Sequence, residues 1–160
     1  MVRFMSNDKT QNQAKDLFVY GTLIFDGVLE SLLGYIPNKQ EVVVSGYVAR
    51  NISLEGWEPF PVLLKSDEHS VSGYILENLT EQDFIRLDCY EFTDREYYFR
   101  KPLAVAGRDS VCFYEPAKNL LDIGVIGDVW DTSELDPLLE SIYVDSVVPK
   151  FKRDNPNLFK

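Results

Sequence analysis

The chain of 160 residues has little of the chemistry that builds metal centres and disulfide frameworks. It contains one histidine, His69, and two isolated cysteines, Cys89 and Cys112, so a tetrahedral zinc site is not predicted. Both cysteines have apolar or aromatic neighbours, where a buried reduced thiol is the commoner state. HExxH, P-loop and GxGxxG motifs are also absent. The sequence therefore predicts neither a metal ion nor an organic cofactor.

Long apolar runs are missing as well. No stretch approaches the roughly 18 apolar residues that a membrane span requires. The start, MVRFMSNDKTQNQAK, has a basic residue but no apolar centre, so it does not resemble a signal peptide. We expect residues 1–16 to form a flexible polar tail, residues 17–160 to form a single domain, and the protein to reside in the cytoplasm.

Positive charge is scarce. The chain has 26 Asp and Glu against 16 Lys and Arg, which gives a net charge of −10. Because residues 1–16 carry +1 and residues 150–160 carry +3, the segment between them carries −14. Phosphate backbones and anionic membranes are repelled by such a surface. We therefore expect neither nucleic acid nor a membrane as a partner.

The chain does contain enough apolar material for a core, since 45% of its residues are hydrophobic and 13% are aromatic. Apolar runs bounded by turn residues predict about six strands, with a bulge at Gly46 and a polar turn at Asp67 and Glu68. These strands lie within residues 17–23, 41–54, 59–66, 71–79, 97–107 and 110–116. Because they arrive in runs, the predicted class is α+β: a small mixed, partly closed β-barrel with flanking helices.

Three helices are predicted. Asp26 is placed to cap a short first helix, whose apolar positions have helical spacing. Those positions are Val28, Leu29, Leu32 and Leu33. Thr80 and Asp83 have the spacing of a capping box for a second helix, which runs from about residue 81 to 89 or 90. Leu79 and Phe84 flank that box as a hydrophobic staple.

The third predicted helix begins at Asp136 and Pro137, an acidic cap followed by proline in the first turn. Helical spacing gives it an apolar face of Leu138, Leu139, Ile142 and Tyr143.

Three short segments carry groups that could do chemistry. In Tyr20-Gly21-Thr22-Leu23, the glycine at a strand end lets backbone N–H groups turn outward to hold a carboxylate or carbonyl oxygen. Taken alone, this segment fits an ordinary turn better. Asp88 and Glu91 end the second helix, where carboxylates oppose the helix dipole. An acid placed there among aromatic residues is a candidate for a raised pKa, and a solvated carboxylate at a helix end is the alternative. In the third segment, Tyr98-Phe99-Arg100, the simplest role of the arginine is an ion pair with one of the many acidic residues.

Together and in this order, the segments resemble a known family. YGTL at residues 20–23, LDCYEF at 87–92 and YYFR at 97–100 resemble the gamma-glutamylcyclotransferase-like superfamily. Within it, they are most similar to the AIG2-like, or gamma-glutamylamine cyclotransferase, family. Pro61 in PFPVLL and Tyr114 in VCFYEP fit further positions of the family pattern. The resemblance covers about residues 17–116.

The resemblance implies an enzyme that acts on a small molecule. Its reaction converts a gamma-glutamyl amine or gamma-glutamyl amino acid to 5-oxoproline and a free amine, by intramolecular aminolysis without a cofactor. Glu91 matches the catalytic glutamate, which would act as the proton shuttle. Tyr20, Gly21, Thr22 and Leu23 match the loop whose backbone binds the glutamyl group, so we expect this loop and Glu91 to share one cavity. Tyr114 is a candidate for lining the pocket, whereas Tyr98 and Arg100 are assigned to structure.

Two positions depart from the family pattern. Phe92 follows Glu91 where the family usually has glycine, and Phe is a poor occupant of a position that needs positive φ. Ile24 follows the YGTL segment where a basic residue is usual. Both departures bear on substrate identity. The alternative is a non-catalytic protein that keeps the fold as a small-molecule-binding or scaffold module, and Phe92 is the main argument for it.

Overall fold

A computed structural model of the chain describes residues 15–57, 59–91, 96–105, 107–108, 110–130 and 137–159. Residues 1–14 of the predicted tail, the departure at Phe92 and the predicted cap Asp136 lie outside the described residues. The first strand begins at Asp16, just before the predicted start at Leu17.

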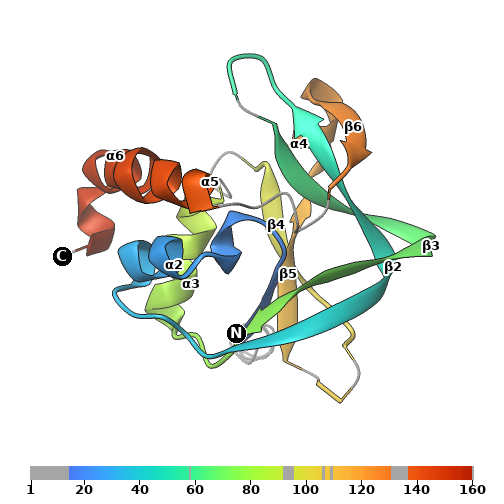
Figure 1. The fold of residues 1–160 in the computed structure, drawn as a ribbon, viewed down its shortest axis with the longest axis horizontal. Helices are drawn as coiled ribbons and strands as arrows, with labels where there is room; N and C mark the ends of the chain where they lie inside the picture. The colour runs from blue at the N-terminus through green and yellow to red at the C-terminus, as the bar shows by residue number, and fades with distance from the viewer. Residues whose placement is uncertain are drawn as a thin grey trace, which may run out of the picture.

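Six strands form a single sheet within the described residues, in the order β4-β5-β1-β3-β2-β6 (Figure 1). They are β1 (Asp16–Val19), β2 (Lys39–Ser53), β3 (Phe60–Leu76), β4 (Tyr98–Pro102), β5 (Val111–Pro116) and β6 (Val125–Val129). Neighbours are antiparallel except β1 and β5, which pair in parallel with Leu17 opposite Cys112. The curved, unclosed sheet with helices beside it confirms the predicted α+β class and the partly closed barrel.

The strands differ from the prediction in two places. The two strands predicted at residues 59–66 and 71–79 form one strand, β3, which covers residues 60–76, and the predicted turn around Asp67 is wrong. The pairing of β3 with β2 shifts between Ser45 and Tyr47, so that residues 66–69 face Gly46 alone, whose φ is 89°. The bulge predicted at Gly46 is confirmed, and it absorbs the polar residues without ending the strand. Strand β6 is absent from the prediction because its residues are all exposed and do not alternate.

Helix α3 (Glu81–Tyr90) matches the prediction closely. The Thr80 side chain accepts a hydrogen bond from the Asp83 backbone, and the Asp83 carboxylate accepts one from the Thr80 N–H. Leu79 and Phe84 are both buried in the main core, as a hydrophobic staple requires. Local sequence is sufficient here because every partner in the cap lies within one turn.

Helix α2 (Asp26–Leu33) forms where predicted, but the predicted cap is wrong. Phe25 occupies the capping position, and Asp26 is already the first helical residue. The Asp26 carboxylate instead pairs with Lys39 of β2. A short 3-10 turn, η1 (Thr22–Ile24), precedes the helix, and α4 (Lys118–Ile123) is a further short helix that the sequence pattern did not predict.

The third predicted helix forms and extends to Asp154. Elements α5 (Pro137–Ile142), η4 (Tyr143–Val147) and α6 (Val148–Asp154) run on without a break, so we call residues 137–154 the C-terminal helix. A last 3-10 turn, η5 (Pro156–Phe159), follows. Leu138 and Ile142 of the predicted apolar face are 70% and 48% exposed. The face that contacts the core is instead formed by Tyr143, Val144 and Val148, and it spans the π turn η4.

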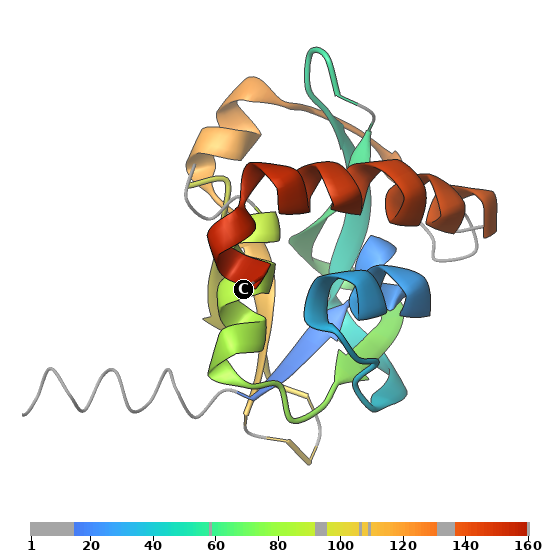
Figure 2. The same cartoon turned by 90° about the vertical axis from the view of Figure 1, so that its left-hand side faces the viewer.

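The core has two parts, one on each side of the sheet. Along β1, Leu17 and Val19 belong to the cluster between the sheet and the helices, whereas Phe18 belongs to the cluster on the opposite face. This alternation is what a strand buried on both faces produces. Figures 1 and 2 show α2, α3 and the C-terminal helix gathered on one side of the sheet. None of the described helices is long and apolar enough to cross a membrane.

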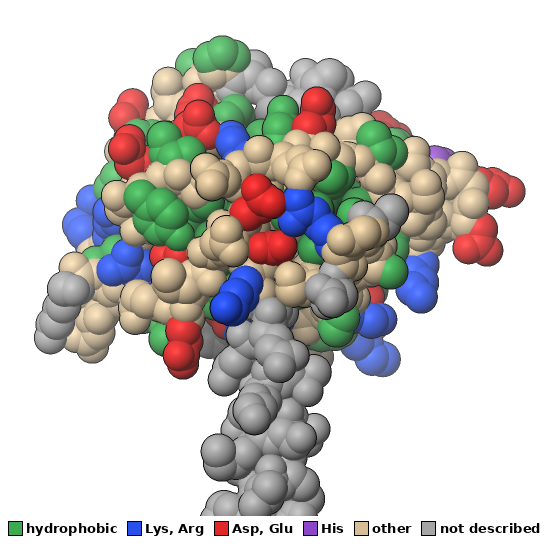
Figure 3. Space-filling model, turned by 90° about the horizontal axis from the view of Figure 1, so that it is seen from below, with side chains coloured by type: hydrophobic (Ala, Val, Ile, Leu, Met, Phe, Trp, Pro, Cys, Tyr) green, Lys and Arg blue, Asp and Glu red, His purple; other side chains and the backbone are tan. Residues whose placement is uncertain are grey.

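A polar network surrounds the beginning of β1. The Asp16 carboxylate, which is buried, accepts hydrogen bonds from the Asn78 backbone at 3.0 Å and from Arg108 at 3.2 Å. Arg108 also pairs with Glu77 at 2.8 Å and contacts Gln40. Seen from below in Figure 3, acidic and basic side chains are intermixed on the surface, and neither sign dominates this face.

Candidate active site

Glu91 occupies the C-terminal cap of α3. Its backbone N–H donates to the Leu87 carbonyl at 2.9 Å, so the last turn of the helix holds it in place. The capping box fixes the start of this helix, and the buried side chains of Phe84 and Leu87 fix its rotation against the sheet. Asp88 and Glu91, three residues apart, therefore lie on one face of α3.

The Tyr20–Leu23 loop leaves β1 at the end of the strand that is near Glu91. Trp130 Nε1 donates to the Tyr20 carbonyl at 3.2 Å, and the turn closes with a 3.0 Å bond from the Ile24 N–H to the Gly21 carbonyl. A Cβ at Gly21 would lie 3.1 Å from Cγ of Pro61, so glycine allows the loop to approach β3. The side chain of Leu23 is buried in the core. Only backbone groups of Leu23 are thus available for binding.

The structure brings this loop and Glu91 close together. Burial raises the pKa of the Tyr20 hydroxyl, and the negative charge of Glu91 raises this pKa further. Tyr90 is a second connection between the loop and Glu91, because its side chain shares a hydrogen bond with Thr22. Burial is the main cause that raises the Tyr90 pKa, and the charge of Glu91 raises it further. Two segments about seventy residues apart in the sequence therefore form one cluster.

The electrostatics of Glu91 are those of a group that can exchange protons near neutrality. Burial raises the pKa of its carboxyl group from 4.5 to about 7, and the negative charge of Asp88 contributes in the same direction. The sequence pattern attributes such a shift to the helix dipole, whereas the structure makes desolvation the leading cause. Glu91 as a whole is half-buried.

Asp88 has a different environment from Glu91. Its Oδ1 accepts a hydrogen bond from the Tyr114 hydroxyl at 2.6 Å and pairs with Arg100 Nε at 3.0 Å. The guanidinium of Arg100 also lies 4.5 Å from the centre of the Phe84 ring. Arg100 thus has the structural role that the sequence predicts. In the part of the chain that the structure describes, no ion pair holds the Glu91 carboxylate.

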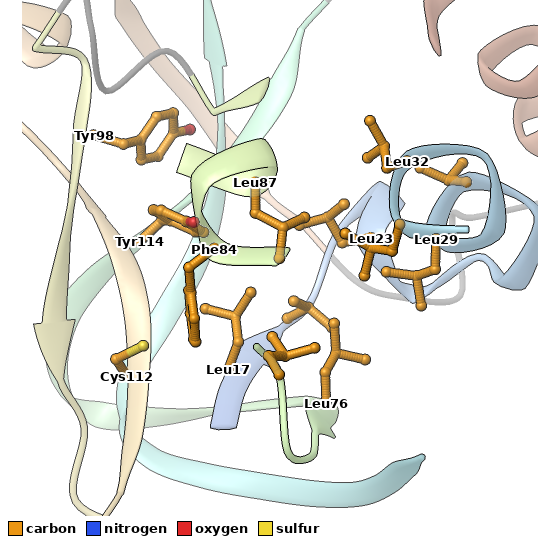
Figure 4. Packing of buried hydrophobic residues seen from close by; sticks show 14 of the residues in the cluster. Leu17, Leu23, Leu29, Leu32, Leu76, Phe84, Leu87, Tyr98, Cys112 and Tyr114 are labelled. Atoms are coloured by element: carbon orange, nitrogen blue, oxygen red, sulfur yellow. The ribbon is translucent and has the colours of Figure 1, made fainter. Parts of the chain in front are cut away.

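Tyrosines from three strand segments surround these carboxylates. Tyr98 and Tyr114 extend from β4 and β5 toward α3 (Figure 4). Burial raises the pKa of both hydroxyls, and the charge of Glu91 acts on both in the same direction. The Tyr98 hydroxyl also donates to the Pro61 carbonyl at 3.4 Å. Tyr98, assigned to structure by sequence reasoning, and Tyr90, which that reasoning missed, therefore join the predicted Tyr20 and Tyr114.

The position of Tyr90, directly before Glu91 in the LDCYEF segment, is the sequence signal that could have identified it. Among the residues that the structure describes, no three His, Cys, Asp or Glu side chains are grouped to hold a metal ion. The chemistry available at this site is that of one carboxyl group with a pKa near 7, a turn of backbone N–H groups and neutral phenol hydroxyls.

Comparison with known proteins gives a family match over most of the chain. A family model described as "Gamma-glutamyl cyclotransferase, AIG2-like" matches residues 17–131. AIG2-like protein C of Arabidopsis thaliana is 36% identical over 84 residues, which are 52% of this chain and 46% of that protein. AIG2-like protein D of the same plant is 32% identical over 81 residues, 51% of this chain and 50% of that protein. The matched part thus spans about half the length of these curated relatives.

Solved structures share the fold. A solution structure of an Arabidopsis thaliana protein aligns with a TM-score of 0.53 and 20% identity, over 91% of this chain and 93% of that one. A structure of a gamma-glutamyl cyclotransferase aligns with a TM-score of 0.56 and 10% identity, over 89% of this chain and 80% of that one. At these identities the likeness is one of fold.

Proposed function

Because this chain belongs to the AIG2-like gamma-glutamyl cyclotransferase family, we propose that it is an enzyme that releases 5-oxoproline from a gamma-glutamyl compound. The substrate is a gamma-glutamyl amine or a gamma-glutamyl amino acid, and the second product is the free amine or amino acid. The observation that carries the proposal is the Glu91 carboxyl group, enclosed beside the Tyr20–Leu23 loop with a pKa of about 7.

The reaction needs one proton acceptor that can later become a donor. The α-amine of the glutamyl group loses a proton to Glu91 and attacks the γ-carbonyl carbon, which forms the ring C–N bond. The tetrahedral intermediate then collapses, the original amide C–N bond breaks, and Glu91 returns its proton to the departing nitrogen. A pKa near the working pH suits both halves of this exchange.

The loop supplies position and charge stabilisation. Holding the glutamyl chain curled, with amine and carbonyl in contact, provides much of the acceleration because the attack is intramolecular. Backbone N–H groups at the start of η1 have no partner within such a short turn, so they can donate to the glutamyl carboxylate or to the oxyanion. Tyr20 and Tyr114 line the site and stay neutral, because burial raises the pKa of both hydroxyls.

The proposal is tested by incubating the purified chain with gamma-glutamyl amino acids, a gamma-glutamyl alkylamine and gamma-glutamyl-lysine, and measuring 5-oxoproline. Release from at least one compound, at a rate proportional to protein concentration, is the expected result. Absence of 5-oxoproline with all of them, together with saturable binding of one, would favour the non-catalytic binding protein.

A further inference from the structure

The C-terminal helix lies outside the residues that the family model matches, yet it packs on the elements that carry the candidate site. Val148 is fully buried, and Tyr143, Val144 and Phe151 pack against the main core. Figure 2 shows this helix crossing the side of the molecule where α2 and α3 lie. Its contacts with the site occur at two points.

The first contact is made at the start of α2, directly after the loop. Oε2 of Glu140 accepts a hydrogen bond from the Gly27 N–H at 2.9 Å, across 113 positions of sequence. The N–H groups of a first helical turn have no partner within the helix, and a negative charge is favourable there. Glu140 thus performs the capping function that the sequence pattern assigns to Asp26.

Gly27 lets the two helices approach closely enough for this bond. A Cβ on Gly27 would lie 2.8 Å from Oε2 of Glu140 and 3.0 Å from Cγ2 of Val144. A side chain at this position would displace the Glu140 carboxylate from its place beside the Gly27 N–H. The contact therefore depends on both helices: Glu140 provides the carboxylate, and Gly27 has no side chain that would occupy its place.

The second contact is made through the last residue of α3. The Phe151 ring packs edge-on against Tyr90, with ring centres 5.3 Å apart and an interplanar angle of 88°. Tyr90 in turn shares its hydrogen bond with Thr22 of the loop and stands next to Glu91 in the sequence. The C-terminal helix thus contacts the start of α2, which follows the loop, and the end of α3, which carries Glu91.

We propose that the C-terminal helix is a working part of the substrate site, and that Glu140 is a positioning residue that holds the Tyr20–Leu23 loop in its binding conformation. Glu140 acts through Gly27 and the start of α2, which anchor the end of the loop. The inference rests on the proposed function for its effect on substrate. Its other claim, that Glu140 orders the loop, is independent of catalysis.

The test compares Glu140→Ala, which removes the acceptor, with Glu140→Gln, whose amide oxygen can still accept from Gly27. Asp154→Ala is the matched control, because it removes a carboxylate from the same helix whose partner is Lys150 at 2.7 Å. Two quantities are measured: amide hydrogen exchange of residues 22–28, and KM and kcat for 5-oxoproline release.

We expect Glu140→Ala to speed exchange of these amides about tenfold and to raise KM by a similar factor, with kcat reduced less. In Glu140→Gln the exchange rate and KM should stay near the wild-type values, and Asp154→Ala should change neither quantity. Unchanged exchange in Glu140→Ala would overturn the inference, and so would an equal effect of Asp154→Ala. If the wild-type chain releases no 5-oxoproline, the proposed function fails while hydrogen exchange still decides whether Glu140 orders the loop.

Discussion

The two ends of strand β1 place a carboxylate in opposite environments. Where the strand begins, Asp16 is buried but receives hydrogen bonds from a backbone N–H and from Arg108. Where the strand ends, the charge of Glu91 acts on Tyr20, and the pKa of Glu91 rises to about 7 because burial is not offset by an ion pair among the described residues. The paired carboxylate joins segments of the fold, whereas an enclosed carboxylate without an ion pair can take up a proton near neutral pH.

The largest expected effect is on catalysis at the Glu91 end. Glu91→Gln preserves size and hydrogen bonding but removes the ability to take a proton, so turnover should fall by about 10²–10⁴ while substrate binding survives. 5-Oxoproline release and substrate affinity are the measurements. Glu115→Gln is the control, because Glu115 pairs with Lys101 at 3.3 Å and is not part of the cluster. A rate near that of the wild type in Glu91→Gln would refute the assignment of Glu91.

The same carboxyl group should make stability depend on pH. Its pKa is about 7 in the folded chain and near 4.5 in the unfolded chain, so the folded chain binds more protons between these values. Stability should therefore fall as pH rises from about 4.5 to 7, by roughly 3 kcal/mol from this group, and then remain level. Glu91→Gln has no ionisable group at this position, so its unfolding free energy should exceed that of the wild type increasingly from pH 5 to pH 7.5. Chemical denaturation of both proteins at several pH values measures it, and a difference independent of pH would contradict it.

A smaller effect, on stability and not on catalysis, is expected at the Asp16 end. Asp16→Ala leaves the Asn78 N–H without its acceptor and removes one of the two carboxylates that pair with Arg108, which should cost about 1–3 kcal/mol of stability. Asp16→Asn keeps an acceptor for the Asn78 N–H and should cost less. In both variants kcat per folded molecule should be unchanged, since Asp16 lies at the far end of β1 from Glu91. A loss of kcat without a loss of stability would remove the distinction between the two ends.

The smallest effect is expected for Asp88, which is paired like Asp16 but lies beside Glu91. Asp88 is paired with Arg100, yet its charge still contributes to the raised pKa of Glu91. Asp88→Asn should therefore move the acidic limb of the pH–rate profile to lower pH, by up to about one unit. Asp122→Asn, which removes an exposed carboxylate paired with Lys118, should leave the limb in place. A shift to higher pH in Asp88→Asn would contradict the electrostatic account.

The sequence predicts best those features whose partners are close along the chain. The capping box of Thr80 and Asp83 and the helix that ends at Glu91 depend on neighbouring residues, and both form as expected. The prediction for Asp26 fails because the acceptor at the start of α2 comes from Glu140, far away in the sequence. No local pattern can reveal such a partner.

The candidate site shows the same division. The order of the YGTL, LDCYEF and YYFR segments predicts the family, and the family match over residues 17–131 confirms it. The roles of Glu91 and of the Tyr20–Leu23 loop stay predictions. The sequence does not reveal that burial dominates the Glu91 pKa, or that Tyr90 and Tyr98 join the cluster, because both depend on strands and helices that meet only in the fold. The predicted turn at Asp67 fails for a related reason, since Gly46 on the partner strand accommodates the polar residues.

The parallel pairing of β1 with β5 has a consequence for the order of folding. Strands β2 and β3 are consecutive and pair through a short connection, so their hairpin can form early. β1 must instead be inserted between β3 and β5, where Leu17 meets Cys112 only after most of the chain has been placed. Closing so long a segment is entropically slow. We therefore expect the β2–β3 amides to gain protection before those of β1 in pulsed hydrogen exchange during refolding. Enzymatic activity should return only with this last strand, because β1 carries Tyr20 to Glu91.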